Sequence, residues 1–206
     1  FCFLISWYVS LFNSNSFETW SMNLFSLLLK VSSCVARLSK KSIIKYIKKT
    51  KPNYFIHAAG LSIPMSIHDK NIKKSIMLNI IGTSNVVIAC EKFKLKLIYL
   101  STGYVYPGIK GNYKENDSIN PFNKYAWSKL GGESAVQMYK NSLIIRASMT
   151  EKPFVHKSAF ANVKTNFIFH DDFIKIFLKI LNKKGIFNIG GKAQTVYQFA
   201  KANNKK

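Results

Sequence analysis

A tyrosine followed four residues later by a lysine is the pattern in this chain that is best suited to acid–base chemistry. On a helix this spacing puts the phenol and the ammonium on one face, where the cation favours the phenolate and lets the tyrosine act near neutral pH. The pattern occurs at three places, Tyr106/Lys110, Tyr125/Lys129 and Tyr197/Lys201. Because lysine is so common in this chain, the spacing alone does not show which pair is functional. The predicted helices and strands around each pair must be considered.

Two of the pairs lack a suitable setting. Tyr106 is followed by Pro107 and Gly108, which is typical of a turn, so no helix aligns it with its lysine. Tyr197 and Lys201 can share a helix, but no strand ending in a hydroxyl residue lies at a suitable distance before them.

The pair Tyr125/Lys129 has both requirements. It lies in the helical pattern NKYAWSKLGGESAVQMYK, and an apolar strand upstream, 97–100, ends in Ser101 and Thr102. Because ligands of parallel α/β sheets bind at the carboxyl ends of the strands, we expect Thr102 to lie beside Tyr125 at that edge.

Strands and helices alternate along the chain from about residue 39. Strands are predicted near 54–58, 97–101, 143–147 and 186–189, and helices near 39–52, 67–93 (one long helix or a pair), 123–140, 171–181 and from about 195. The connections are too long for hairpins, so the sequence predicts an α/β, Rossmann-like, mainly parallel sheet with helices on both faces, incomplete at its N-terminus. We expect residues 39–206 to form this domain, after an atypical or truncated segment 1–38.

With these elements in order, the chain resembles the sugar-nucleotide branch of the extended short-chain dehydrogenase/reductases, which includes dTDP-4-dehydrorhamnose reductases and NAD-dependent epimerase/dehydratases. The matching pieces are KPNYFIHAAG, LNIIGTSNVVIAC, KLIYLSTGYVYPG, YAWSKLGGE, SLIIRAS, DDFIKIFLKIL and GIFNIGGKAQTVYQFAK. The resemblance covers roughly residues 51–202 and is specific because the pieces occur together in the family's order.

The resemblance implies a site that binds NADH or NADPH and a nucleotide sugar. Tyr125 would exchange a proton with the sugar, Lys129 would hold the nicotinamide ribose and lower the pKa of Tyr125, and Thr102 would hydrogen-bond the reacting oxygen. The other cofactor-binding residues would be Ala58, Ala59, Gly60 and Asn79.

Each of these residues also has a purely structural interpretation. Tyr125 can be a packing residue, Thr102 can merely end its strand, and the turn HAAG can serve only to leave the sheet. For Asn79 a structural hydrogen bond is favoured over a proton relay. At the level of function, the alternatives to a reductase are an epimerase or dehydratase and a non-catalytic binding module of the same fold.

Two departures from the family pattern concern the cofactor and the reaction. The family opens with a glycine-rich turn whose backbone binds the cofactor pyrophosphate, whereas the first glycine in this sequence is Gly60. The residue that would discriminate NAD from NADP is missing with it. In addition, Gly103 stands where rhamnose-type reductases often carry an aspartate.

Composition narrows the class of protein. The 206 residues are 48% hydrophobic, enough for the core of one domain, and the formal net charge is +22. Since only Arg37 and Arg146 are arginines and the lysines are scattered, we expect no nucleic-acid partner, although small anions remain suitable ligands. We also expect no membrane partner and a cytoplasmic location, and a homodimer is left open.

No metal site is expected. Cys2, Cys34 and Cys90 are far apart, which fits a reducing compartment. The four histidines lack a carboxylate or cysteine partner at ligand spacing and are expected at the surface or as satisfied core residues: His57, His68, His156 and His170. The opening apolar run of twelve residues is too short to span a bilayer and a poor signal peptide, and we expect a damaged or truncated start.

The irregular segment 149–166, with the region up to 172, is expected on the substrate side. It supplies four basic side chains that could meet a diphosphate, followed by two aspartates: Lys152, His156, Lys157 and Lys164, then Asp171 and Asp172. A solvated loop is the equally supported alternative.

Overall fold

A computed structural model describes residues 39–62, 65–152, 154 and 158–203. In chain order its elements are α2 (Lys40–Thr50), β1 (Tyr54–His57), α3 (Ile67–Lys70), α4 (Ile72–Ser75), η2 (Ile76–Ile81), α5 (Gly82–Phe93), β2 (Lys96–Thr102), η3 (Gly103–Val105), α6 (Lys124–Gln137), β3 (Ser142–Ala147), β4 (Met149–Thr150), β5 (Lys164–Thr165), β6 (Ile168–Phe169), α7 (His170–Ile180), β7 (Gly185–Ile189), β8 (Gln194–Thr195) and α8 (Val196–Asn203). The segment 1–38, set apart in the sequence, lies outside the described residues.

Four parallel strands form the main sheet, in the order β1-β2-β3-β7. The register pairs Phe55 with Leu97 and Thr102 with Ala147, so the carboxyl ends of β2 and β3 are level. The α/β fold with a mainly parallel, Rossmann-like sheet is thus confirmed. The four predicted strands are all present.

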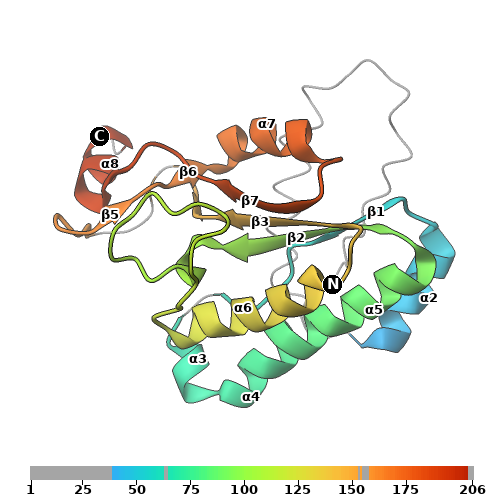
Figure 1. Ribbon diagram of the computed structural model, residues 1–206. Helices are drawn as coiled ribbons and strands as arrows, with labels where there is room; N and C mark the ends of the chain where they lie inside the picture. The colour runs from blue at the N-terminus through green and yellow to red at the C-terminus, as the bar shows by residue number, and fades with distance from the viewer. Residues whose placement is uncertain (1–38, 63–64, 153, 155–157, 204–206) are drawn as a thin grey trace.

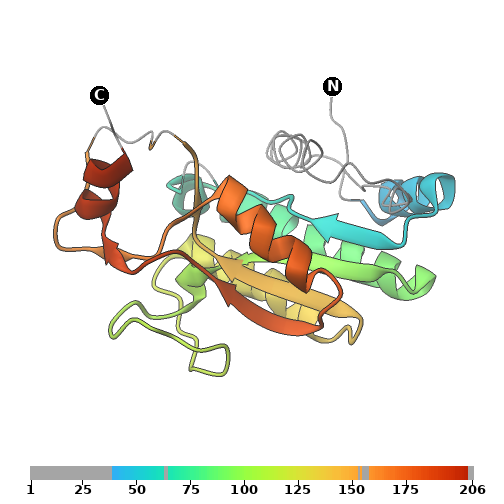
Figure 2. The ribbon, with the colours of Figure 1, turned by 90° about the horizontal axis from the view of Figure 1, so that it is seen from above.

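The sheet is the middle of three layers, with α7 on one face and α2, α5 and α6 on the other (Figure 1). Alternate residues of β2 explain this arrangement, because Ile98 and Leu100 pack with α7 residues whereas Leu97 and Tyr99 pack with α2, α5 and α6. Seen from above, α7 lies across the strands (Figure 2). Every residue of β2 and β3 is buried, as expected for strands covered on both faces.

The helical stretch 67–93 contains a wide π-helical turn, η2, between α4 and α5. By length and composition its part Ile72–Phe93 is the one stretch among the described residues that could cross a membrane. It supplies Val86, Ala89 and Cys90 to the core, each with 0% exposure. Burial in the core therefore accounts for part of its apolar character, while other apolar side chains on it are exposed.

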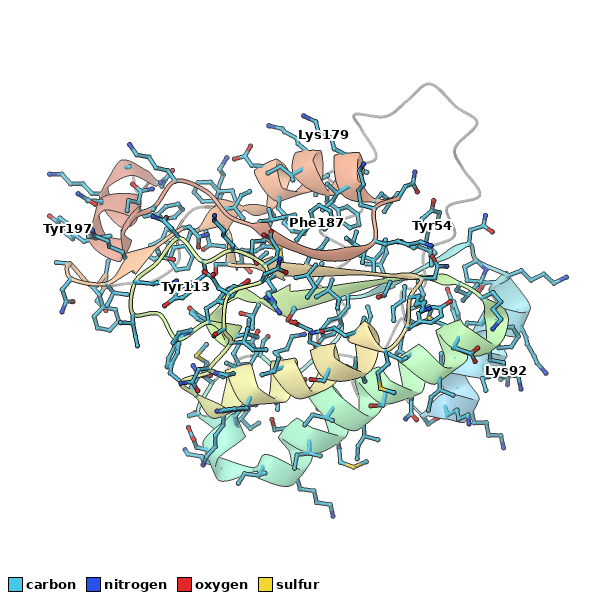
Figure 3. All side chains as sticks on the ribbon, in the orientation of Figure 1. Tyr54, Lys92, Tyr113, Lys179, Phe187 and Tyr197 are labelled. Atoms are coloured by element: carbon cyan, nitrogen blue, oxygen red, sulfur yellow. The ribbon has the colours of Figure 1, made fainter. Side chains whose placement is uncertain are left out.

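Short elements complete the structure beyond β3. β4 pairs with β6 in parallel, β5 pairs with β8 antiparallel, and four phenylalanine rings cluster among them: Phe154, Phe167, Phe169 and Phe199. Lysines such as Lys92 on α5 and Lys179 on α7 lie on the outer surfaces (Figure 3).

Candidate active site

The end of β2 and the first turns of α6 bring Thr102, Tyr125 and Lys129 together. Thr102 is the last residue of β2, and its hydroxyl accepts a hydrogen bond from the Tyr104 amide at 3.3 Å. Asn123 caps α6 by accepting from the Ala126 amide at 2.7 Å, which fixes where the helix begins and places Tyr125 in its first turn. The Thr102 side chain lies close enough to the Tyr125 phenol to lower its pKa, although burial outweighs this effect.

Aromatic rings surround the half-buried Tyr125. His68 lies edge-on with its ring centroid 5.3 Å away, and Tyr104 lies at 6.3 Å in a similar edge contact. Burial raises the pKa of Tyr125 to about 12, while the Thr102 side chain acts in the opposite direction. The phenol is therefore protonated at neutral pH and available as a proton donor.

Lys129 is buried, with 7% exposure, one turn further along α6. Its ammonium donates to the Leu100 carbonyl at 2.7 Å and lies 4.2 Å from the centroid of the Tyr99 ring. Burial lowers the pKa of Lys129 to about 7, and Glu133 opposes that shift. Burial thus brings the titration of Lys129 into the neutral pH range.

The expectation that Lys129 lowers the pKa of Tyr125 is wrong in this structure, where that pKa is raised. The two side chains share a helix face, but the Leu100 carbonyl holds the ammonium and burial governs the phenol. The side chain that favours the phenolate is that of Thr102.

Asn79 joins the turn after β1 to α6. Its amide donates to the Leu61 carbonyl at 2.9 Å and to Ser128 Oγ at 2.8 Å, and its carbonyl oxygen accepts from the Leu61 amide at 2.7 Å. With both ends of the amide in use, the contacts of Asn79 are those of a structural hydrogen-bonding residue.

The small residues Ala58, Ala59 and Gly60 follow β1 and are half-buried. A Cβ on Gly60 would lie 3.1 Å from Asn79 Oδ1 and 3.9 Å from Lys129 Nζ. A larger residue at position 60 would therefore fill the space between the turn 58–60 and the Lys129 ammonium. The cofactor-binding residues expected from the sequence thus gather at one sheet edge.

The histidines differ from expectation at one position. His57 is a satisfied core residue, since its Nε2 is 2.9 Å from Thr83 Oγ1 and burial lowers its pKa to about 3. His68 is also buried, with Nδ1 2.7 Å from Ser75 Oγ, but its Nε2 has no hydrogen-bond partner among the described residues. Within that part of the chain, the prediction of a surface or satisfied position is therefore wrong for His68. His170 is half-buried, and His156 lies outside the described residues.

The other two tyrosine–lysine pairs do not form comparable sites. Tyr106 is buried beyond the short helix η3, and its lysine, Lys110, is exposed and paired with Asp117 at 3.5 Å. Tyr197 on α8 is 50% exposed (Figure 3).

The expected substrate-side residues are only partly described. Lys152 lies 4.5 Å from the centroid of the Phe169 ring, and Lys164 is exposed in β5. Asp171 and Asp172 are exposed in the first turn of α7. His156 and Lys157 lie outside the described residues.

A buried ion pair beneath the site was not anticipated. Arg146 on β3 donates to Glu133 on α6 at 2.6 Å, and both side chains are almost fully buried, with 2% and 0% exposure. A sequence signal did exist, because Glu133 follows Lys129 by one helical turn on the same face and acids are scarce in this basic chain.

Within the described ranges, no cluster of histidine, cysteine or acidic residues could hold a metal ion. The described cysteine, Cys90, is a buried free thiol whose pKa burial raises to about 12.

Comparison with known proteins matches residues 24–166 to the family model of the RmlD substrate binding domain. A dTDP-4-dehydrorhamnose reductase from Aggregatibacter actinomycetemcomitans is 30% identical over 114 residues, which are 54% of this chain and 38% of that protein. The methionine adenosyltransferase 2 subunit beta of Xenopus laevis is 30% identical over 103 residues, 50% of this chain and 30% of that protein. The chain thus spans about a third of the length of the curated relatives it matches.

Solved structures show the same fold. A hypothetical dTDP-4-dehydrorhamnose reductase from Sulfolobus tokodaii has a TM-score of 0.72 at 27% identity, over 80% of this chain and 65% of that one. The dTDP-4-dehydrorhamnose reductase of Bacillus anthracis, solved in complex with NADP, has a TM-score of 0.74 at 21% identity, over 81% of this chain and 66% of that one.

Proposed function

The chain belongs to the RmlD substrate binding domain family, and from that premise we propose that it acts as an NAD(P)-dependent sugar-nucleotide oxidoreductase, nearest in kind to dTDP-4-dehydrorhamnose reductase. The observation that carries the proposal is the placement of Thr102 at the end of β2 next to Tyr125 in the first turn of α6, with the buried Lys129 one turn away. A hydroxyl, a phenol and an ammonium at the carboxyl edge of a parallel sheet are suited to transferring a proton to a carbonyl oxygen.

The described residues fit the nicotinamide end of the cofactor. Lys129 is a buried hydrogen-bond donor, and Gly60 has no side chain that would fill the space next to its ammonium. The pyrophosphate end has no such support in the printed sequence, which lacks the family's glycine-rich turn. The proposal therefore assigns Ala58, Ala59, Gly60, Tyr125 and Lys129 to the nicotinamide end, and Asn79 to holding their scaffold.

When bound, the reduced nicotinamide supplies the hydride. Tyr125 is protonated at neutral pH and donates its phenolic proton to the carbonyl oxygen of the sugar. Thr102 donates its hydroxyl proton in a hydrogen bond to the same oxygen and so orients the sugar. Lys129 would turn from the Leu100 carbonyl to bind the ribose hydroxyls of the cofactor.

The position of Gly103 bears on the exact reaction. A Cβ at this position would lie 3.1 Å from Ser148 Oγ, so the backbone there is close to the chain after β3. An aspartate of the kind expected in rhamnose-type reductases is not available from this residue. An epimerase or dehydratase that uses the same three residues is the nearest alternative within the proposal.

A non-catalytic binding module is the second candidate. It is favoured by the similarity to methionine adenosyltransferase 2 subunit beta, which is named as a subunit of another enzyme. In such a protein the fold would be kept while Tyr125 and Lys129 serve packing.

Cofactor binding and turnover separate the candidates. The chain, and in parallel its whole encoded reading frame, is titrated with NADPH and NADH by nicotinamide fluorescence. Whichever nucleotide binds, NADPH or NADH, is then tested for oxidation by the protein in the presence of a dTDP-4-dehydro-6-deoxy sugar. We expect saturable binding and turnover; if neither nucleotide binds to either form, the oxidoreductase is excluded and the binding module remains.

A homodimer and a cytoplasmic location complete the proposal. The dimer is supported by exposed apolar side chains along the helical stretch 72–88: Ile72, Ile76, Met77, Ile81 and Ile88. Light scattering coupled to gel filtration tests the dimer, and cell fractionation tests the location.

A further inference from the structure

Glu133 is the one acidic residue among the described residues that is buried, and its carboxylate has no contact with solvent. Arg146 donates to Oε1 from Nη2 at 2.6 Å and from Nε at 3.1 Å, while Ser101 Oγ donates to Oε2 at 2.5 Å. The carboxylate is thus fixed from the ends of two strands, β3 and β2.

Arg146 is in turn fixed at its outer end. Its Nη1 donates to the Tyr106 hydroxyl at 2.7 Å, and that hydroxyl donates to Asn188 Oδ1 on β7 at 2.9 Å. The guanidinium also lies 5.0 Å from the centroid of the Tyr106 ring. This arrangement leaves Arg146 no other acidic partner and holds its charge on Glu133.

The fixed ion pair lies next to the candidate site at two points. Glu133 follows Lys129 by one turn on the buried side of α6, and Ser101 directly precedes Thr102 on β2. An unneutralised carboxylate at this place would attract the Lys129 ammonium strongly, since charges interact more strongly in a buried environment than in water. The observed ammonium instead donates to the Leu100 carbonyl.

We propose that Glu133, neutralised by Arg146 and held by Ser101, is the positioning residue that sets the charge and the place of Lys129. The inference rests on the proposed function only in so far as Lys129 is the cation of that site. The effect of Glu133 and Arg146 on Lys129 itself needs no cofactor or substrate.

The other groups that face Lys129 are neutral near pH 7. From β1, His57 has a pKa of about 3. From β2, Tyr99 has a pKa raised by burial, and Tyr125 on α6 itself has a pKa of about 12. The Glu133–Arg146 pair is therefore the charged element that can move the titration of Lys129.

The test follows the titration of Lys129 in the full chain by NMR with lysine labelled at Cε. The Lys129 signal is assigned by its loss in Lys129→Met, and it should titrate near 7, apart from surface lysines near 10.4. Glu133→Gln leaves the Arg146 charge alone and should lower the pKa of Lys129 by about one unit. Arg146→Met leaves the carboxylate alone and should raise it by about as much.

Shifts of opposite sign distinguish this proposal from a general loss of packing, which would move both variants the same way. The double variant Glu133→Gln/Arg146→Met should give an intermediate value. Glu91→Gln is the matched control, since Glu91 is an exposed acid paired with Lys94 on α5, and it should leave Lys129 unchanged.

Single removal of a buried partner can prevent folding. Ser101→Ala keeps both charges and removes the shorter of the two hydrogen bonds to Glu133 Oε2, leaving the 3.4 Å bond from Arg146 Nε, and it should still raise the pKa of Lys129. If Ser101→Ala causes no shift, or if both charge variants shift the same way or not at all, the proposal is overturned. Because no step requires NADPH, expected shifts in a chain that binds no cofactor would uphold this proposal while the proposed function fails.

Discussion

The ammonium of Lys129 donates a 2.7 Å hydrogen bond to the main-chain carbonyl of Leu100, in the strand that ends at Thr102. This bond ties α6 to β2 immediately beside the candidate site. It also means that the cation and Tyr125 share a helix face without the lysine setting the pKa of the phenol. Thr102 and burial do so instead.

Replacement of Tyr125 by phenylalanine tests the proton donor. Tyr125→Phe should lower the turnover rate by about 100- to 10,000-fold, as expected for loss of a general acid, and change NADPH affinity far less. Steady-state kinetics and a fluorescence titration measure the two quantities.

Tyr197→Phe is the matched control, because Tyr197 also precedes a lysine by four residues but is half exposed on α8. Tyr106 is unsuitable for this purpose, since its hydroxyl accepts from Arg146. Near-normal turnover of Tyr125→Phe would contradict the assignment of the site.

The pKa of Lys129 has a consequence for stability. With a value of about 7 in the folded chain and about 10.4 unfolded, the unfolded state binds more protons between these pH values. Stability from this group therefore rises as pH increases from about 7 to 10, by at most about 1.4 kcal/mol per pH unit. Lys129→Met should lack this rise.

Urea unfolding of both proteins at several pH values isolates the contribution, because the other lysines cancel in the difference. The exposed Lys92→Met is the control and should follow the parent chain. Parallel curves for Lys129→Met and the parent would show that Lys129 titrates normally.

The strands were predictable because their signal is local. β2 and β3 are buried on both faces, so their apolar runs 97–100 and 143–145 stand out between polar ends, and the predicted bounds differ from the observed ones by about one residue. The setting of Tyr125 followed from the same reasoning, since Ser101 and Thr102 end one such run.

What could not be predicted depends on contacts between distant segments. The π-helical turn 76–81 contains Asn79, whose side chain binds Leu61 and Ser128, and no local pattern specifies those partners. The spacing of Glu133 from Lys129 is visible in the sequence, but its partners Arg146 and Ser101 come from two distant strands and could not be predicted locally.

Acid stability should depend on His57. Its pKa is about 3 in the folded chain and about 6.5 unfolded, so the unfolded state binds more protons between these values and stability is lost as pH falls from about 6.5 to 3. His57→Gln keeps a group that can bond Thr83 but does not titrate. We expect a shallower loss of unfolding free energy between pH 6 and 4, measured by urea unfolding; an unchanged slope would contradict the buried neutral imidazole.

Gly132 tests the contact between α6 and the π-helical turn. A Cβ on Gly132 would lie 2.4 Å from the Asn79 carbonyl oxygen and 2.9 Å from the Tyr99 hydroxyl, closer than real side chains approach. Gly132→Ala must therefore push α6 away from Asn79, and overpacking of this kind costs about 1–3 kcal/mol, more than the gain in helix propensity. Ser134→Ala, at an exposed position on the same helix, should change stability by no more than about 0.5 kcal/mol. Urea unfolding compares the two, and equal stabilities would mean that α6 and the π-helical turn do not meet at Gly132. Because the same displacement would separate Ser128 from Asn79, now 2.8 Å apart, Gly132→Ala should also weaken the support of Lys129, one residue further along α6.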